Sequence, residues 1–158
     1  MNSDELPDKD QFERSIKAST VALMRDAFFL LGNQIGAGVA AAGFPQRPAH
    51  SSVFAFLALE GSRLTELATK AAMTPQAMAE LVDDLQRLGY VTRIPDPRDG
   101  RAKLIVYTEY GLENMRVSFG VIQNVEQRLV TLLGADRVAE LRSTLTAIVA
   151  AADQPDPA

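Results

Sequence analysis

The chain has 158 residues, a formal net charge of -4 at pH 7 and 47% hydrophobic residues. This length and composition fit one or two small globular domains and argue against disorder of the whole chain. The sequence has no cysteine, which excludes a disulfide framework, thiolate metal sites and thiol-based redox sensing within this polypeptide. Because the first residues are acidic and polar and do not resemble a secretory signal, we expect a cytoplasmic protein.

A long first helix is predicted before Pro45 from apolar residues at mostly helical spacing. These residues are Phe12, Ile16, Leu23, Ala27, Leu30 and Leu31. The stretch Ala27–Gln46 has no charged residue and is about long enough to span a bilayer. Polar residues, glycines and a proline interrupt it, and its second half is mostly alanine and glycine, so we expect no membrane segment. The glycines instead favour close approach of another helix.

A second helix is predicted to start near Pro48 and to stop at Gly61, because the residues His50–Leu59 are compact and apolar. The residues Ser62–Leu64 could form a very short strand. Thr65 is then expected at the N-cap of a short helix.

The next helix has clear boundary signals, with Thr74 at the N-cap, Pro75 at the first helical position and Gly89 after its end. Two short helices joined by a tight turn form a helix-turn-helix. We expect this helix to bury a stripe made of Leu81, Val82, Leu85 and Leu88.

A hairpin is predicted to follow, because Tyr90–Ile94 and Leu104–Thr108 have strand-forming residues and Pro95–Gly100 has dense turn signals. Between Gln86 and Lys103 there are five basic and two acidic residues, a net charge of +3, which leaves -7 elsewhere. Phosphate attraction acts over about a Debye length, so this local patch is compatible with DNA binding by an acidic chain.

The helical pattern returns from Leu112 to Leu132, stops at Gly134, and continues from Val138 until about Ala152. Residues 1–9 and 152–158 are expected to be disordered. The apolar stripes at both ends of the chain have little else to bury against, which suggests a two-fold dimer. The alternative is a monomer in which these stripes cover one another.

The central motifs resemble those of the MarR family of bacterial transcriptional regulators in order and spacing. They are Leu64-Thr65-Glu66-Leu67-Ala68, Met73-Thr74-Pro75-Gln76, Leu81-Val82-Asp83-Asp84-Leu85, Gly89-Tyr90-Val91, Asp99-Gly100-Arg101-Ala102-Lys103 and Tyr107-Thr108-Glu109-Tyr110-Gly111. The resemblance implies a mainly α (α+β) fold, with a winged helix-turn-helix at 47–111 and helical dimerisation regions at 10–46 and 112–151. It also implies a homodimer that binds a pseudo-palindromic operator in double-stranded DNA, usually as a repressor released by a small ligand.

By this resemblance, the recognition helix enters a major groove, and its groove-facing candidates are Thr74, Gln76, Ala77 and Glu80, joined by Met78 if the helix is turned. Gln76 has the chemistry for a bidentate contact to adenine. The backbone amides beside Thr74 could hold a phosphate.

In the hairpin, or wing, Arg98 and Arg101 are the candidates for backbone or minor-groove contact, because guanidinium groups suit a narrow, electronegative groove. Lys103 would add a phosphate contact. In the family, the acid at the position of Asp99 pairs with an arginine and fixes the wing, which implies that Asp99 orients Arg101. The alternative is a solvated hairpin tip without a partner.

The recognition helix departs from the family pattern, since Glu80, Asp83 and Asp84 are acidic and no base precedes Arg87. Asp83 could lie on the protein side and pair with an arginine. An alternative function follows from this acidity: a winged-helix module that binds a basic protein instead of DNA.

His50 is the only histidine, so metal binding is not expected. The family resemblance implies that His50 or Arg47 could line a pocket for a small aromatic effector, whereas a hydrogen-bonded helix start is the more frequent role for such a histidine. We expect no cofactor, and no enzyme activity, because phosphate loops, nucleophile elbows and cysteine–histidine arrangements are missing from the sequence.

Overall fold

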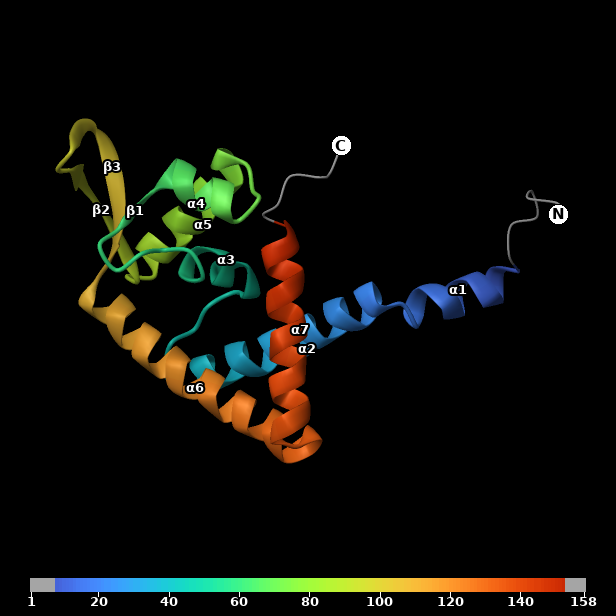
Figure 1. Ribbon diagram of the computed structural model, residues 1–158. Coiled ribbons are helices and arrows are strands. Elements are labelled where there is room, and N and C mark those ends of the chain that lie inside the picture. Colours follow the sequence, from blue (N-terminus) through green and yellow to red (C-terminus); the bar gives the residue numbers. More distant parts are fainter. Residues whose placement is uncertain (1–7, 153–158) are drawn as a thin grey trace.

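The computed structural model describes residues 8–152, which form a mainly helical protein with one small antiparallel sheet (Figure 1). The helices and strands in chain order are α1 (Lys9–Lys17), α2 (Thr20–Ala41), the 3-10 helix η1 (Pro48–His50), α3 (Ser51–Phe54), β1 (Ser62–Arg63), α4 (Leu64–Lys70), α5 (Pro75–Arg87), β2 (Val91–Asp96), β3 (Asp99–Tyr107), α6 (Glu109–Leu133) and α7 (Ala135–Ala152).

The predicted single N-terminal helix is wrong, because the structure divides it into α1 and α2. Ser19 has an extended backbone between them, and its hydroxyl donates to the Ile16 carbonyl at 2.7 Å and accepts from the Ala22 amide at 3.2 Å. A serine with this geometry is an N-cap, so it starts a new helix. Together α1 and α2 form an arm that projects from the rest of the molecule (Figure 1).

The C-terminal part of the arm packs on α6 and approaches it closely at Gly38. A Cβ built on Gly38 would lie 2.7 Å from Val121 Cγ1, which confirms the predicted close approach of another helix. Gly32 and Gly36 have no such neighbour within the described part of the chain. Among residues 8–152, no helix has the length and apolarity that a membrane crossing needs.

We call the region from η1 to β3 the head. Its short helices surround the core that Val53, Leu67, Met78, Val82 and Leu85 share with the first residues of β2. Two predicted boundaries here are wrong. The second helix ends at Phe54, well before Gly61. Helix α4 begins at Leu64 and has Arg63, whose amide donates to Glu66 Oε2 at 3.0 Å, at the N-cap in place of Thr65.

The sheet has the order β1-β3-β2, and the β2–β3 hairpin is the wing. Val91 pairs with Tyr107 at its base and Asp96 pairs with Asp99 at its tip, with a register shift between Pro95 and Asp96. The turn is therefore shorter than the predicted Pro95–Gly100, because the strands continue to the tip. The very short strand predicted after Gly61 is confirmed as β1, which pairs with the other side of β3.

The C-terminal helices form a hairpin that turns at Gly134, where φ is +88°. A glycine adopts this conformation without strain, so the predicted break is confirmed. Helix α7 then runs back beside α6, and Arg142 pairs with Glu126 at 2.6 Å. Most of α7 is exposed, including its apolar residues Leu141, Leu145, Ile148 and Val149.

Candidate nucleic-acid interface

Helix α5 presents its first turn to solvent and is capped as the sequence predicts. Thr74 Oγ1 accepts a hydrogen bond from the Ala77 amide at 3.2 Å, and Pro75 occupies the first helical position. Thr74 and Gln76 are exposed, and Ala77 is half-buried. This turn therefore presents exposed polar side chains beside the positive end of a helix dipole, an arrangement that favours an anion.

Met78 is a correction to the predicted interface. Its side chain is fully buried in the core of the head, together with Leu81, Val82 and Leu85. The spacing of three, four and seven residues puts all of them on one helical face, so Met78 cannot face a groove. Leu88 is a second correction, since it is the C-cap residue and is 41% exposed rather than part of the buried stripe.

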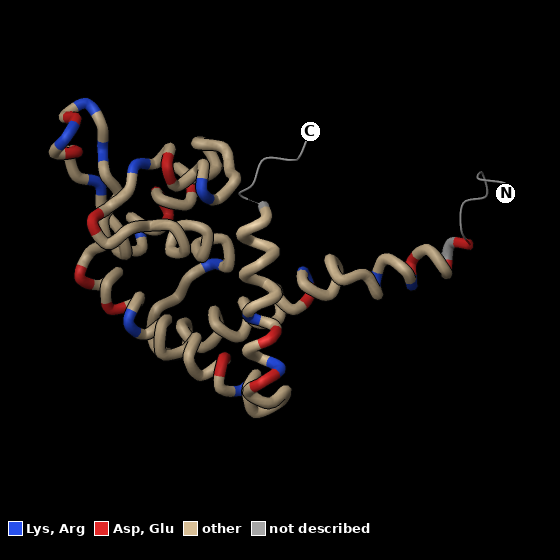
Figure 2. Tube along the Cα trace, in the orientation of Figure 1, with Lys and Arg blue, Asp and Glu red and all other residues tan. Residues whose placement is uncertain are grey.

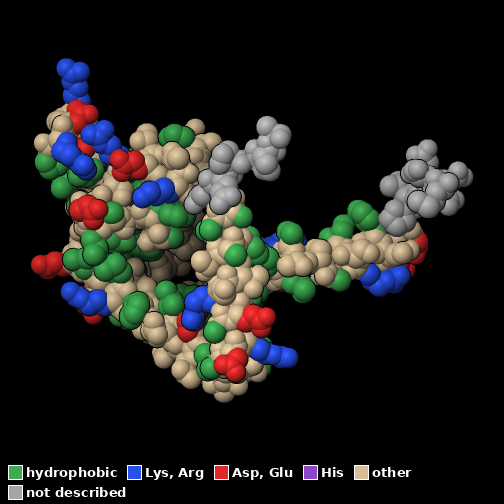
Figure 3. Space-filling model, in the orientation of Figure 1, with side chains coloured by type: hydrophobic (Ala, Val, Ile, Leu, Met, Phe, Trp, Pro, Cys, Tyr) green, Lys and Arg blue, Asp and Glu red, His purple; other side chains and the backbone are tan. Residues whose placement is uncertain are grey.

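Basic residues gather at the tip of the wing (Figure 2), and the space-filling view shows their side chains exposed there (Figure 3). The Arg98 side chain is 83% exposed, and Arg101 and Lys103 are exposed as well. Among the ion pairs of residues 8–152, none involves the side chain of Arg101 or Lys103. Their charges are therefore available to a polyanion.

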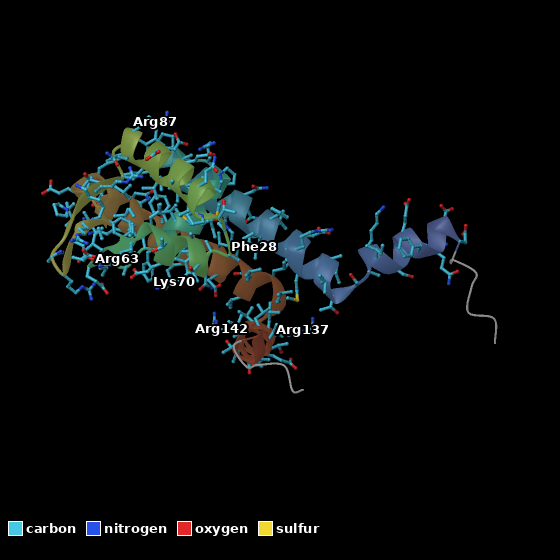
Figure 4. All side chains as sticks on the ribbon, turned by 90° about the horizontal axis from the view of Figure 1, so that it is seen from above. Phe28, Arg63, Lys70, Arg87, Arg137 and Arg142 are labelled. Atoms are coloured by element: carbon cyan, nitrogen blue, oxygen red, sulfur yellow. The ribbon has the colours of Figure 1, made fainter. Side chains whose placement is uncertain are left out.

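A buried carboxylate, Asp96, fixes the tip of the wing. Asp96 Oδ1 accepts from the Arg98 amide at 2.8 Å, and Oδ2 accepts from Arg63 Nε at 2.8 Å. The hydrogen bond from the Arg98 amide and then that from the Arg63 guanidinium lower the pKa of Asp96 below its usual value. Arg63 lies beside the wing in Figure 4. The carboxylate thus ties the basic tip to β1.

In the charge balance of residues 86–103, Asp96 appears only as an acid that weakens the basic patch. A signal was present, because aspartate followed by proline is favoured at the first positions of a β-turn. No local pattern indicates Arg63, whose partner Asp96 is 33 residues away in the sequence.

Asp99 contacts an arginine side chain and the backbone of Arg101. Its Oδ1 accepts from the Arg101 amide at 3.2 Å, and its Oδ2 lies 3.6 Å from an Arg63 guanidinium nitrogen. Asp99 therefore holds the backbone amide of Arg101, in line with the expectation that it orients this residue. The guanidinium with which Asp99 pairs is that of Arg63.

The two aspartates in the middle of α5 pair with cations of their own chain. Asp83 Oδ1 lies 2.6 Å from an Arg93 guanidinium nitrogen, which agrees with the suggested pairing of Asp83 on the protein side. Asp84 contacts Arg47, His50 and Arg87. Since these partners offset both carboxylates, the acidity of α5 no longer favours a basic protein as its partner.

Arg47 and His50, the candidate effector ligands, belong to this internal network. The His50 side chain is fully buried, its Nε2 lies 2.9 Å from Asp84 Oδ2, and its Nδ1 accepts from the Arg47 amide at 3.1 Å. Both ring nitrogens are engaged, so the geometry supports the hydrogen-bonded helix start over ligand binding.

Known proteins resemble this chain in both sequence and fold. The model of the MarR family matches residues 46–102. The HTH-type transcriptional regulator MT0903.1 of Mycobacterium tuberculosis is 33% identical over 105 residues, which cover 59% of this chain and 73% of that protein.

Two solved structures share the fold. A transcriptional repressor, CouR, bound to a 23-mer DNA duplex has a TM-score of 0.68 and 23% identity, covering 92% of this chain and 99% of that chain. CouR from Rhodococcus jostii RHA1 bound to p-coumaroyl-CoA has a TM-score of 0.66 and 24% identity, covering 84% and 92%. The match to the MarR family model and the mycobacterial relative show that the chain belongs to the MarR family of transcriptional regulators.

Proposed function

We propose that this regulator is a homodimeric repressor that binds a pseudo-palindromic operator and is released by a small effector. The observation that carries the proposal is the wing tip, where exposed basic side chains are held in place by the ion pair between buried Asp96 and Arg63. A basic tip held by the fold loses less conformational freedom on binding than a loose loop does. Similarity to a repressor bound to a DNA duplex also supports DNA as the partner.

On each subunit, the first turn of α5 enters a major groove. Gln76 reads a base edge with its carboxamide, and Ala77 contacts a thymine methyl or the groove wall. Thr74 and the amides of this turn hold a phosphate. Exposure of Thr74 and Gln76 supports these roles, whereas buried Met78 takes no part.

The wing supplies the remaining contacts. Arg98 and Arg101 bind the sugar-phosphate backbone or a narrow minor groove, and Lys103 binds a phosphate. Asp99 does not contact DNA. It holds the Arg101 amide and so fixes the course of β3 beneath the Arg101 side chain.

A homodimer is supported by apolar side chains that the subunit leaves uncovered. Phe28 on α2, labelled in Figure 4, is 69% exposed, and Figure 3 shows apolar side chains along the arm. Other exposed apolar residues lie on α2, α6 and α7 and include Val21, Leu23, Phe29, Leu30, Phe119, Leu132, Leu141 and Val149. A solvent-exposed set of this size on one subunit indicates an interface. Pairing of two copies covers these apolar side chains, whereas they stay exposed in a monomer.

The effector is a small aromatic compound. This choice is supported by the fold that the chain shares with a regulator bound to p-coumaroyl-CoA. Arg47 and His50 are not assigned to the effector, because they are bonded to each other and to Asp84. Addition of p-coumaroyl-CoA or simple aromatic carboxylic acids to the DNA complex tests the proposal. Release of DNA by one of them supports it, and unchanged binding across the series contradicts this choice of effector class.

Substitutions in the wing and in α5 test DNA binding on a duplex that the protein itself enriches from a random pool. Arg101→Ala removes one charge-assisted contact from each wing at about 1.5–3 kcal/mol, so the dimer loses about 3–6 kcal/mol and binding nearly disappears. Glu80→Ala is the matched control on the exposed face of α5, and it leaves affinity unchanged or improves it because a charge near the phosphates is removed.

Fluorescence anisotropy over a range of salt concentrations measures both effects. A DNA complex weakens steeply with salt, since each phosphate contact releases counterions. Unchanged affinity in Arg101→Ala counts against the wing contacts. A shallow salt dependence favours the protein-binding alternative.

A further inference from the structure

The linker between α2 and η1, residues 42–47, connects the arm to the head and is held in place by aromatic side chains. Phe44 is buried, and its ring lies 5.0 Å from that of Tyr110. Tyr90, directly after the turn that ends α5, donates its hydroxyl to the Pro45 carbonyl at 2.9 Å. These contacts hold the linker against the head at Tyr90 and against the start of α6 at Tyr110.

The linker is joined to the middle of α5 through one carboxylate. Since His50 Nδ1 accepts from the Arg47 amide, it carries no proton, and Nε2–H donates to Asp84 Oδ2. The Arg47 guanidinium contacts the same oxygen. Arg87 binds the other oxygen at 2.7 Å, so both oxygens of Asp84 have partners.

Burial distinguishes this connection from the neighbouring ion pair. The Asp84 side chain is 15% exposed and faces a fully buried imidazole, whereas Asp83 is 60% exposed. Exposed pairs contribute little, while hydrogen bonds in a partly dry environment are stronger and more directional. The hydrogen bond from His50 lowers the pKa of Asp84, and Arg47 and Arg87 act in the same direction against burial, so the charged form persists at neutral pH.

Apolar packing holds α5 on the core without specifying a direction, because the hydrophobic effect is non-directional. The stripe with Met78 and Leu85 holds α5 on the core. A carboxylate bound by an imidazole, by contrast, has one preferred geometry.

We propose that Asp84 is a positioning residue: through His50 and Arg47 it sets the orientation of α5 relative to the linker, and thereby the spacing between the two recognition helices of the dimer. This inference rests on the proposed function, because it needs two subunits on one operator. It also gives a role to an acid that is out of place on a helix that approaches phosphates.

The test uses the inverted repeat enriched by the wild-type protein, together with duplexes that have one base pair added or removed between the half-sites. The ratio of affinities for the selected and altered spacings is the readout. Asp84→Ala is expected to reduce this ratio at least about fivefold, because α5 can then adapt to either spacing. Asp83→Ala, next in the same helix, is expected to keep the ratio within about twofold.

A pair of His50 variants keeps the test decisive if Asp84→Ala does not fold. In His50→Gln the side-chain amide can take the place of Nε2 and donate to Asp84, so the ratio stays near that of the wild type. In His50→Leu the donor is lost and the ratio falls as in Asp84→Ala. A merely structural role lowers affinity for all spacings equally in folded protein, and that result overturns the proposal. Absence of an enriched repeat for the wild-type protein is a different failure, which overturns the proposed function and this inference together.

Discussion

Replacing Gly111 by alanine should destabilise the junction between the head and α6. A Cβ at this position would lie 1.9 Å from the Tyr90 carbonyl oxygen and 2.9 Å from its carbon. Ordinary contact begins at 3.4 Å, so one backbone must move by about 1.5 Å. Neither is free to move, because the Tyr90 carbonyl accepts from the Thr108 amide at 3.1 Å and the Gly111 amide donates to Thr108 Oγ1 at 3.0 Å.

The expected cost is at the upper end of the range for overpacking, about 3 kcal/mol or more, since the obstacle is backbone rather than a flexible side chain. For a protein of this size, that corresponds to a fall of about 6–12 °C in Tm. Thermal unfolding followed by circular dichroism measures it, with all variants at one protein concentration because dimers unfold in a concentration-dependent way.

Gly120→Ala is the matched control on the same helix. Apart from its chain neighbours and the backbone of its own helix, no atom of the described subunit lies within 4 Å of a Cβ at this position. Alanine in a helix interior should therefore stabilise the protein by about 0.5–1 kcal/mol. A Gly111→Ala variant that unfolds at the wild-type temperature would refute the close approach of α6 to Tyr90.

Further substitutions test the other parts of the interface. Met78→Ala should cost about 2–5 kcal/mol in chemical denaturation, because it leaves a cavity in the core; a loss below about 0.5 kcal/mol would mean that Met78 is exposed after all. Thr74→Ala should cost about 1 kcal/mol by removing the cap of α5, and an unchanged free energy of unfolding would contradict the capping geometry. Because the folded state lowers the pKa of Asp96, the resulting stability is present above the usual value of 3.8 and is lost as pH falls through the folded value. Asp96→Asn should therefore lose less stability than the wild type during acid titration below about pH 4, whereas parallel curves would argue against the Asp96–Arg63 pair.

Local patterns in the sequence were sufficient to predict α5 and the wing. Thr74 and Pro75 are boundary signals whose effect depends on neighbouring residues only, so the start of α5 was predicted correctly. The break at Ser19 was missed, although a serine followed by a helical pattern is a possible N-cap, because the apolar spacing continues across it.

The pairs that hold the site together could not be read from local patterns. Asp84 and His50 are 34 positions apart, and Asp96 and Arg63 are 33 apart, so their contacts exist only in the folded chain. A count of charges treats these acids as repulsive toward DNA, while the structure gives each of them cationic partners. Met78 was wrongly predicted to face DNA. Adjacent residues of one helical turn lie on different faces of the helix, and only the packing decides which face is buried.

The most direct test of the central claim is selection of bound duplexes from a random pool at about 150 mM salt, a condition that suppresses purely electrostatic binding. A dimeric regulator that reads sequence with α5 and the wing predicts enrichment of an inverted repeat whose half-sites are about one helical turn apart. A folded, dimeric protein that enriches no sequence would contradict the claim, and the exposed residues of α5 would then have to serve a partner other than DNA.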